Sequence, residues 1–441
     1  MGHSGSTESS RRTFVKGLAA TGIVGSFGIG GRAEADAGDV YPGWRQGELD
    51  LHFVYTGCGE NMFYRLPDGT AILNDTGDFY RPGDVAHVPL LPSPERLGGE
   101  WMSRYIQRVY PEKTIDYLIF SHWHRDHVGH ATFDRRDTPE EAYRFKTFAD
   151  GTRGNGFLCV AQDFGFRRCF DHQYPARGMY RTQDTSMNLF VPWAEAQKKK
   201  GLVCEPFKVG ALNQIALLRD PGRYADFSIR NICANGRLWD GKDGERDYAA
   251  EYAARTGVKR ISQNALSLGF VMQYGRFRFW SGGDTQDIPA SKRKNEPGFA
   301  YEGLVGERVG PVTLCKMNHH GHFNAMKEAF SRAVRAQTYV SCIWCLRQVH
   351  GPTFDRLAKP EFHTGPDPLI IPTLMPQCRI DSFKRSAFMK NIPTRGAAHV
   401  VVKVLPGGDR YRVYLLDARD ESMRILSRFD RNVPRVVVTG Q

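Results

Sequence analysis

The chain has 441 residues, of which 41% are hydrophobic and 24% are charged, and this composition excludes collagen, coiled-coil and disordered chains. The length allows one large domain or two ordinary ones. The formal net charge is +12; the first 35 residues contribute +2, so the rest of the chain carries +10. Such a charge favours anionic partners, namely phosphate esters, cell-wall polymers, lipid head groups or nucleic acid.

The nine cysteines follow no repeating spacing, and their odd number excludes a fully paired disulfide framework. Cys342 and Cys345 form a single C-x-x-C pair with no second pair to complete a zinc knuckle. We interpret most of the cysteines as small buried hydrophobic residues.

The N-terminus carries a pair of arginines, Arg11 and Arg12, ahead of a glycine-rich apolar run at residues 17–31. Ala33-Glu34-Ala35 then offers a small-x-small cleavage site. This pattern resembles a twin-arginine export signal. It predicts that residues 1–35 are removed and that the twin-arginine translocation machinery exports the folded chain to the periplasm or the medium. After removal no apolar run reaches the roughly 18 to 20 residues that span a bilayer.

The first part of the mature chain shows strand patterns and one helix pattern. Alternating apolar residues indicate strands, and the turn Pro67-Asp68-Gly69 joins two of them into a hairpin. Apolar residues at helical spacing precede a nearly continuous apolar strand, which is typical of a sheet covered on both faces. The predicted strands are 49–56, 61–66, 70–74 and 115–120, and the helix is 95–110.

Residues 131–260 are interpreted as an insertion in a single catalytic domain that spans residues 36–441. Beyond the insertion, strands again alternate with helices, which predicts an α/β fold of two packed mixed sheets flanked by helices. The predicted elements from here on are a helix at 187–199, a hairpin at 265–281, a strand at 312–317, a helix at 323–334 and a hairpin at 399–416.

Polar clusters follow four of the predicted strands, where α/β proteins usually place their sites. In the cluster His-x-His-x-Asp-His, His122 and His124 project to the same side of an extended segment and can reach one metal. The following turn lets Asp126 and His127 reach a second position. Imidazole and carboxylate ligands suit zinc. The clusters are Asp75-Thr76-Gly77, His122 to His127, Gly282-Gly283-Asp284 and His319-His320-Gly321.

These residues resemble the metallo-β-lactamase superfamily, and the resemblance covers roughly residues 49–416. It implies the αββα fold of that family and two divalent metal ions, for which zinc is favoured. It assigns His122 and His124 to the first metal and Asp126 and His127 to the second. His320 completes the second site, and Asp284 bridges both metals. A histidine at position 124, where flavo-di-iron relatives carry glutamate, favours zinc over iron.

The resemblance requires a third histidine for the first metal. His172 is the candidate, because it is the only histidine between His130 and His319. The alternative is that His172 is a histidine of a surface turn. His130 departs from the small residue usual in the family, and we interpret it as a pocket residue rather than a ligand.

The remaining candidates act on the substrate or on the ligands. Asp126 and His319 are the candidate catalytic residues; His319 either supports a ligand, contacts the substrate or exchanges roles with His320. Arg125 either orients a phosphate group or is a solvated arginine. Asp75 is expected to hydrogen-bond a ligand histidine and so fix its tautomer.

The hairpin before Asp284 and the sequence His319-His320-Gly321 resemble one branch of the superfamily. This branch includes the hydrolase-like domain of DNA-uptake channel proteins and the teichoic-acid phosphorylcholine esterases. The resemblance implies a zinc-dependent phosphodiesterase that cleaves an anionic ester with a hydroxide held between the metals. The alternatives are a lactonase or β-lactamase-type hydrolase, an exported nuclease with salt-dependent binding, and a non-enzymatic surface-binding protein. The complete ligand set argues against the last.

Overall fold

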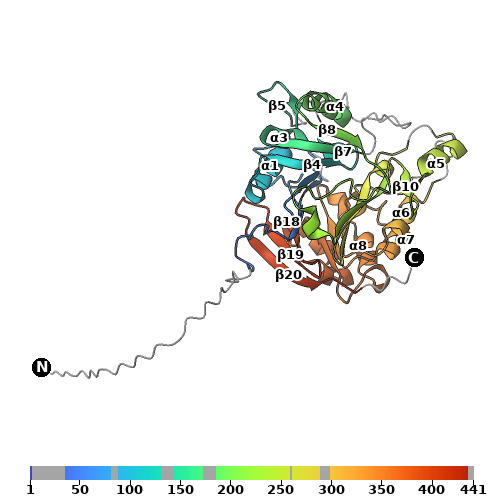
Figure 1. The fold of residues 1–441 in the computed structure, drawn as a ribbon. Coiled ribbons are helices and arrows are strands. Elements are labelled where there is room, and N and C mark those ends of the chain that lie inside the picture. Colours follow the sequence, from blue (N-terminus) through green and yellow to red (C-terminus); the bar gives the residue numbers. More distant parts are fainter. Residues whose placement is uncertain are drawn as a thin grey trace, which may run out of the picture. The chain divides into compact units, whose positions relative to one another are not determined.

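Two mixed β-sheets pack face to face, and helices cover their outer faces (Figure 1). The computed structural model describes, besides Met1, residues 35–80, 88–130, 144–171, 185–258, 261–288 and 298–435. Residues from Ala35 onward form one compact unit. The predicted α/β fold of two packed sheets flanked by helices is therefore confirmed.

The larger sheet has the strand order β20-β19-β18-β1-β2-β3-β4-β7-β8, and β17 also pairs with β18. Its neighbours are antiparallel except for β3–β4, β4–β7 and β7–β8, which are parallel. The strands are β1 (Leu49–Phe53), β2 (Asn61–Arg65), β3 (Ala71–Thr76), β4 (Thr114–Phe120), β7 (Gly165–Asp171), β8 (Val203–Pro206), β17 (Leu374–Met375), β18 (Gly396–Val404), β19 (Arg410–Asp417) and β20 (Ile425–Asn432).

The smaller sheet has the order β11-β10-β9-β12-β13-β14-β15-β16, and its last four strands run parallel. A separate hairpin joins β5 (Lys146–Thr147) to β6 (Arg153–Gly154). The strands of the smaller sheet are β9 (Phe227–Ala234), β10 (Arg237–Trp239), β11 (Glu245–Asp247), β12 (Gly269–Tyr274), β13 (Phe277–Ser281), β14 (Leu314–Lys316), β15 (Thr338–Ser341) and β16 (Leu369–Pro372).

Helices α1, α3 and α4 pack on the larger sheet, and α6, α7 and α8 pack on the smaller one (Figure 1). None of the helices in the described ranges is both long enough and apolar enough to cross a membrane. The α-helices are α1 (Gly98–Val109), α2 (Arg125–Val128), α3 (Phe157–Asp163), α4 (Thr185–Lys198), α5 (Tyr248–Thr256), α6 (Tyr301–Val309), α7 (Glu328–Val334), α8 (Gly351–Leu357) and α9 (Gln377–Phe383). Short 3-10 helices span Pro221–Tyr224, Asn264–Leu266, Asn318–Gly321, Leu346–Gln348, Pro360–Phe362 and Ala387–Asn391.

The period-2 pattern of the strands divides the core into layers. Leu51 and Phe53 of β1 face Met272 and Phe279 of the smaller sheet in the core between the sheets. On β4, Ile119 points into this core, while its neighbours Leu118 and Phe120 point to the helix layer of the larger sheet. This alternation follows from the opposite directions of successive side chains in a strand.

Most predicted elements form, but two regions differ. The helix predicted from residue 323 begins only at Glu328, because Met326 has a left-handed φ of 53°, which interrupts a helix. Strands β7 and β8, from the segment interpreted as an insertion, belong to the larger sheet, and β9, β10 and β11 belong to the smaller.

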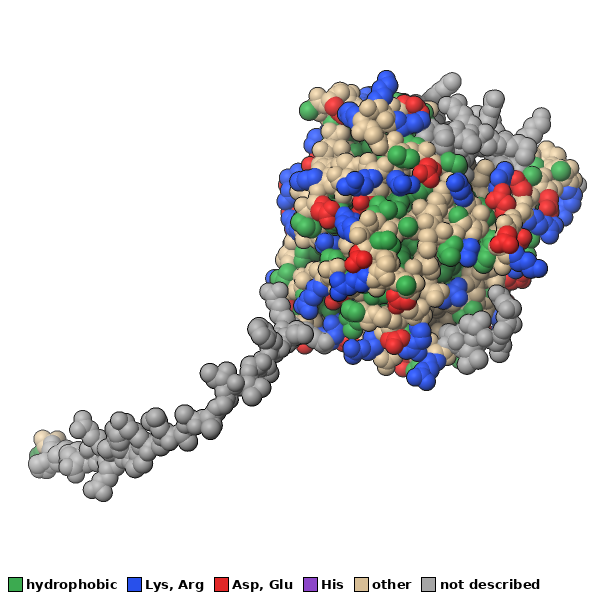
Figure 2. All heavy atoms as spheres, in the orientation of Figure 1, with side chains coloured by type: hydrophobic (Ala, Val, Ile, Leu, Met, Phe, Trp, Pro, Cys, Tyr) green, Lys and Arg blue, Asp and Glu red, His purple; other side chains and the backbone are tan. Residues whose placement is uncertain are grey.

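On the face that Figure 2 shows, the charged side chains are distributed rather than gathered at one place. Figure 2 shows Lys and Arg side chains spread over the visible face and interspersed with Asp and Glu. This face therefore carries charges of both signs without a continuous basic track.

Candidate metal centre

Strand ends from both sheets meet at the candidate site. Asp75 lies near the end of β3, and His122 follows β4, its parallel neighbour. Asp284 and His320 follow β13 and β14, which are parallel neighbours in the other sheet. The carboxyl ends of parallel strands lie at the same edge of a sheet, and this is where the four predicted clusters come together.

Four buried side chains converge through one atom each, and we call them the first ligand group: Asp126, His127, Asp284 and His320. His127 Nε2 lies 3.2 Å from Asp284 Oδ1 and 3.7 Å from Asp126 Oδ2. His320 Nε2 lies 3.2 Å from Asp126 Oδ2 and 3.6 Å from Asp284 Oδ1. Ligand atoms about 2.0 to 2.2 Å from a tetrahedral zinc ion lie at such distances from one another.

A second ligand group consists of His122, His124 and the other oxygen of Asp284. His122 Nε2 lies 3.0 Å from His124 Nδ1 and 3.8 Å from Asp284 Oδ2. These three side chains offer ligand atoms close enough to hold one metal ion. Asp284 therefore presents one oxygen to each of the two ligand groups.

Several of these atoms lack the partners that buried polar atoms normally have. Both carboxylate oxygens of Asp284 and the Nε2 atom of His127 are buried without a hydrogen-bond partner in the described part of the chain. Leaving such atoms unsatisfied is costly, and buried charges are usually paired or bound to metals. The donor set and its unsatisfied atoms both fit a metal cation.

Electrostatics at the site also favour a cation. Burial opposes ionisation of Asp284, yet the facing His127 and His320 hold its pKa well below the usual range. Burial likewise opposes protonation of His127, but Asp284, Asp126 and Asp75 raise its pKa well above the usual value. The carboxylates therefore favour a positive charge at this position, which a bound cation would supply.

Asp75 orients His127 from behind. The Nδ1 atom of His127 donates to Asp75 Oδ2 at 2.9 Å, which leaves the Nε2 lone pair for the ligand group. Asp75 also accepts hydrogen bonds from the backbone N and the Oγ of Ser121, both at 2.7 Å. Asp75 has a left-handed φ of 57°, a strained conformation that these contacts hold in place.

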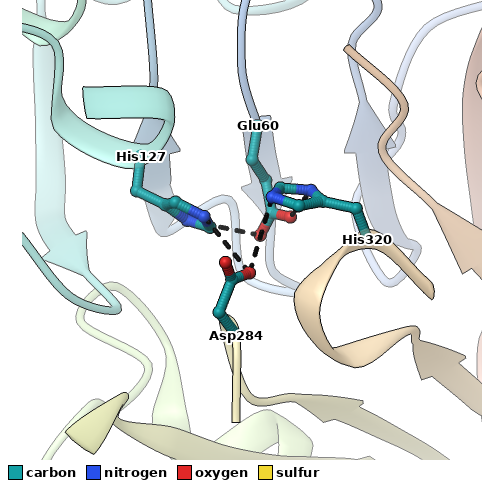
Figure 3. Close-up of side chains that lie close together, drawn as sticks. All are labelled: Glu60, His127, Asp284 and His320. Carbon is teal, nitrogen blue, oxygen red and sulfur yellow. Dashed lines mark ion pairs between the residues drawn. The ribbon is translucent and has the colours of Figure 1, made fainter. Parts of the chain in front are cut away.

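Glu60 and Lys316 lie on the Nδ1 side of His320, and neither residue was predicted from the sequence. Glu60 Oε2 lies 2.7 Å from Lys316 Nζ and 3.2 Å from His320 Nδ1, and both charged side chains are fully buried. Lys316 Nζ also donates to the carbonyl of Gly283 at 2.7 Å, next to Asp284. Figure 3 shows Glu60 close to the rings of His127 and His320.

Glu60 lies within ligand distance of His127, Asp284 and His320, but its position favours a different role. It approaches the Nδ1 atoms of the two histidines, at 3.9 Å for His127, whereas Asp126 approaches their Nε2 atoms. The ammonium of Lys316 beside Glu60 would also repel a metal ion there. We therefore assign Glu60 to the orientation of His320, as Asp75 orients His127.

The signals for this pair were present in the sequence but ambiguous. Lys316 is the only charged residue in the apolar stretch from Val312 to Met317, and Glu60 follows the turn Gly57-Cys58-Gly59. Neither position indicates that the two side chains meet, because they come from different sheets.

His319 lies at the margin of the site with its side chain 20% exposed. Its Nδ1 lies 2.8 Å from Asn324 Oδ1, and its Nε2 lies 3.1 Å from Asn264 Nδ2 and 3.6 Å from Asp284 Oδ2. Burial lowers the pKa of His319 to about 4, so the imidazole is neutral and, by donating from Nδ1 to Asn324, keeps Nε2 as an acceptor. His319 and His320 both have left-handed φ angles, of 45° and 54°.

An aromatic wall stands beside the first ligand group, formed by Phe79, Trp344 and the ring of His130. The indole Nε1 of Trp344 lies 3.3 Å from His320 Nε2, and its ring lies 5.5 Å from Phe79. The guanidinium of Arg125 lies 5.6 Å from the centre of the Phe79 ring. His130 packs on Phe79 and joins neither ligand group.

The remaining predicted ligand, His172, lies outside the described residues. Searches with the whole chain found no matching protein-family model and no matching curated protein.

Proposed function

We propose that the chain is a hydrolase of the metallo-β-lactamase fold that holds two zinc ions. The observation that carries the proposal is the position of Asp284, whose two carboxylate oxygens face two separate histidine groups. The buried, unsatisfied atoms of Asp284 and His127 support it. The mixed two-sheet architecture and the order of the motifs along the chain are those expected of the family.

When bound, the two metal ions would supply a water of lowered pKa and neutralise the charge that develops on the substrate. The protein's own residues then fix the geometry. Asp284 sets the spacing of the two ligand groups, while Asp75 and Glu60 hold the rings of His127 and His320. The side chain of His319, partly exposed and held by Asn324 and Asn264, can contact the substrate at the margin of the site.

The substrate we propose is an anionic phosphodiester. The net charge of +12 supports it, because a positive protein attracts anions over long distances. The indole N–H of Trp344 donates to His320 Nε2 in this structure, and it would become available to an anionic oxygen if a metal ion took that nitrogen.

The reaction class is tested with a panel of chromogenic phosphodiesters, lactones and β-lactams on zinc-loaded protein. We expect hydrolysis of the phosphodiester to dominate and Asp284→Asn to abolish it. Preference for a lactone or β-lactam would retain the metal centre but overturn the substrate assignment. Tight, strongly salt-dependent binding and cleavage of DNA would instead identify a nuclease. A zinc-loaded protein that turns over no member of the panel would favour a binding protein.

We further propose export through the twin-arginine pathway, which carries folded proteins and allows the metals to be loaded before export. The support is the sequence pattern around Arg11 and Arg12. Arg11→Lys combined with Arg12→Lys should leave the protein in the cytoplasm, because the receptor recognises the arginine pair rather than its charge. Fractionation of cells checks this, and unchanged accumulation in the periplasm would contradict it.

A further inference from the structure

Two cysteines lie side by side on the outermost parallel strands of the larger sheet. Cys169 of β7 and Cys204 of β8 are direct partners in the strand register. Neighbouring strands lie about 4.8 Å apart, within the roughly 4.4 to 6.8 Å between Cα atoms that a disulfide requires. Both side chains point to the same helix layer, where Cys169 is buried and Cys204 packs at its border. Each carries a free thiol.

The two thiols differ in exposure and acidity. Cys204 lies half-buried on an edge strand, whereas Cys169 is only 1% exposed. A hydrogen bond from Cys169 lowers the pKa of Cys204, and the positive charge of Lys198 acts in the same direction. Burial raises the pKa of Cys169 well above its usual value. An accessible, more acidic thiol beside a buried one is the arrangement of an attacking and a resolving cysteine.

We propose that Cys169 and Cys204 form a reversible disulfide by exchange with a small or protein disulfide. The thiolate of Cys204 attacks one sulfur of the oxidant, which releases one thiol and leaves a mixed disulfide on Cys204. Cys169 loses its proton and attacks the Cys204 sulfur, which releases the second thiol. The protein pair is oxidised by two electrons, and the oxidant disulfide is reduced to two thiols.

The bond would enclose residues 170–203, a segment that includes α4 and the candidate ligand His172. Ser186 of α4 donates to the carbonyl of Gly129, directly after the helix that carries Asp126 and His127. The disulfide would therefore fasten the edge strand β8 and the segment packed on the metal-binding loop. The proposed export would bring the pair into a compartment where disulfides persist. The exchange itself does not depend on the metal centre or on export.

The test treats the folded chain with glutathione disulfide, followed by alkylation of remaining thiols and peptide mapping. A Cys378→Ser variant, which lacks an exposed thiol, is treated in parallel as the matched control. We expect a cross-linked Cys169–Cys204 peptide and two glutathiones released per chain. Subsequent reduction should lower the melting temperature by on the order of 5 °C, because the closed loop restricts the unfolded chain.

Single variants distinguish the two roles. Cys169→Ala should accumulate a stable glutathione adduct on Cys204, since no resolving thiol remains. Cys204→Ala should leave Cys169 unmodified, because the buried thiol is inaccessible. Recovery of both cysteines as alkylated thiols from treated, folded wild-type protein would overturn the proposal. A glutathione adduct on wild-type Cys204 that Cys169 does not resolve would also overturn it. The two results that would overturn the proposal are measured on the wild-type chain, so they remain decisive if a variant fails to fold.

Discussion

Asp126 and Glu60 approach His320 from opposite sides of its ring, and we propose that this difference separates a metal ligand from a residue that orients one. Asp126 Oδ2 lies 3.2 Å from Nε2, and Glu60 Oε2 lies 3.2 Å from Nδ1. Lys316 neutralises Glu60 at 2.7 Å and so favours its charged form inside the protein. The pKa of Glu60 is lowered although burial opposes it, because Lys316 is so close.

Substitution of each carboxylate should distinguish the two roles. Asp126→Asn removes a ligand and should cost one metal equivalent at micromolar zinc. Glu60→Gln preserves shape and hydrogen bonding, and should retain both metals with an affinity weaker by roughly 10- to 100-fold. Zinc titration followed by elemental analysis measures both effects. Loss of a whole equivalent in Glu60→Gln, with none in Asp126→Asn, would reverse the assignment.

At the scale of elements, the site depends on how closely two loops approach each other. The backbone N of Glu60 donates to the carbonyl of Asp126 at 2.7 Å. A Cβ atom on Gly77 would lie 1.8 Å from that same carbonyl oxygen. Only glycine at position 77 therefore allows the strand that ends in Asp75-Thr76 to pack against the metal-binding loop.

Gly77→Ala should push the two loops apart. We expect the free energy of unfolding to fall by at least about 1 to 3 kcal/mol. Zinc binding should also weaken, because Asp126 is displaced. Gly222→Ala is the matched control, since an added Cβ there meets no atom within 4 Å. Urea unfolding and zinc titration of both variants measure the difference. Equal behaviour of the two variants would show that the close approach does not position the ligand.

Elements with local signals could be predicted from the sequence, whereas those that depend on distant partners could not. The hairpin predicted at 265–281 forms as β12 and β13, with Gly275 in the turn between them. The alternation of apolar and polar residues is weak in β7, because Arg167 and Arg168 interrupt it. The residues of β7 alone do not indicate that this strand pairs with β4. For the same reason the histidines and aspartates of the motifs could be named, while the pairing of Glu60 with Lys316 could not.

At the scale of the whole molecule, two buried histidines away from the metal centre couple stability to pH. His52 of β1 and His399 of β18 lie on adjacent strands of the larger sheet, and burial lowers the pKa of each to about 3. His52 Nδ1 contacts the hydroxyl of Tyr105 at 3.0 Å, and His399 Nδ1 accepts from Tyr55 N at 3.1 Å. Both rings are therefore neutral in the folded protein.

Acid should consequently weaken the fold. The unfolded chain binds protons at these histidines below pH 6.5, but the folded chain does not until about pH 3. The contribution of the two neutral histidines to the free energy of unfolding is fully present above pH 6.5. It is lost on acidification from pH 6.5 to about pH 3, by up to about 1.4 kcal/mol per pH unit for each histidine. His399→Asn keeps an acceptor for the backbone N–H of Tyr55. It should reduce the slope of the unfolding free energy against pH by the contribution of one titrating histidine. Urea unfolding of metal-free protein at several pH values measures the difference; identical slopes would contradict the assignment.

The central claim, that Asp284 joins two metal-binding groups, is tested most directly by metal content per folded chain. We expect wild-type protein reconstituted with zinc to hold about two equivalents, as a two-metal centre requires. His122→Ala should lose one equivalent and retain the group formed by Asp126, His127 and His320. Asp284→Ala should weaken both sites, because it removes a ligand from each. Folded wild-type protein that holds no metal after reconstitution would contradict the account.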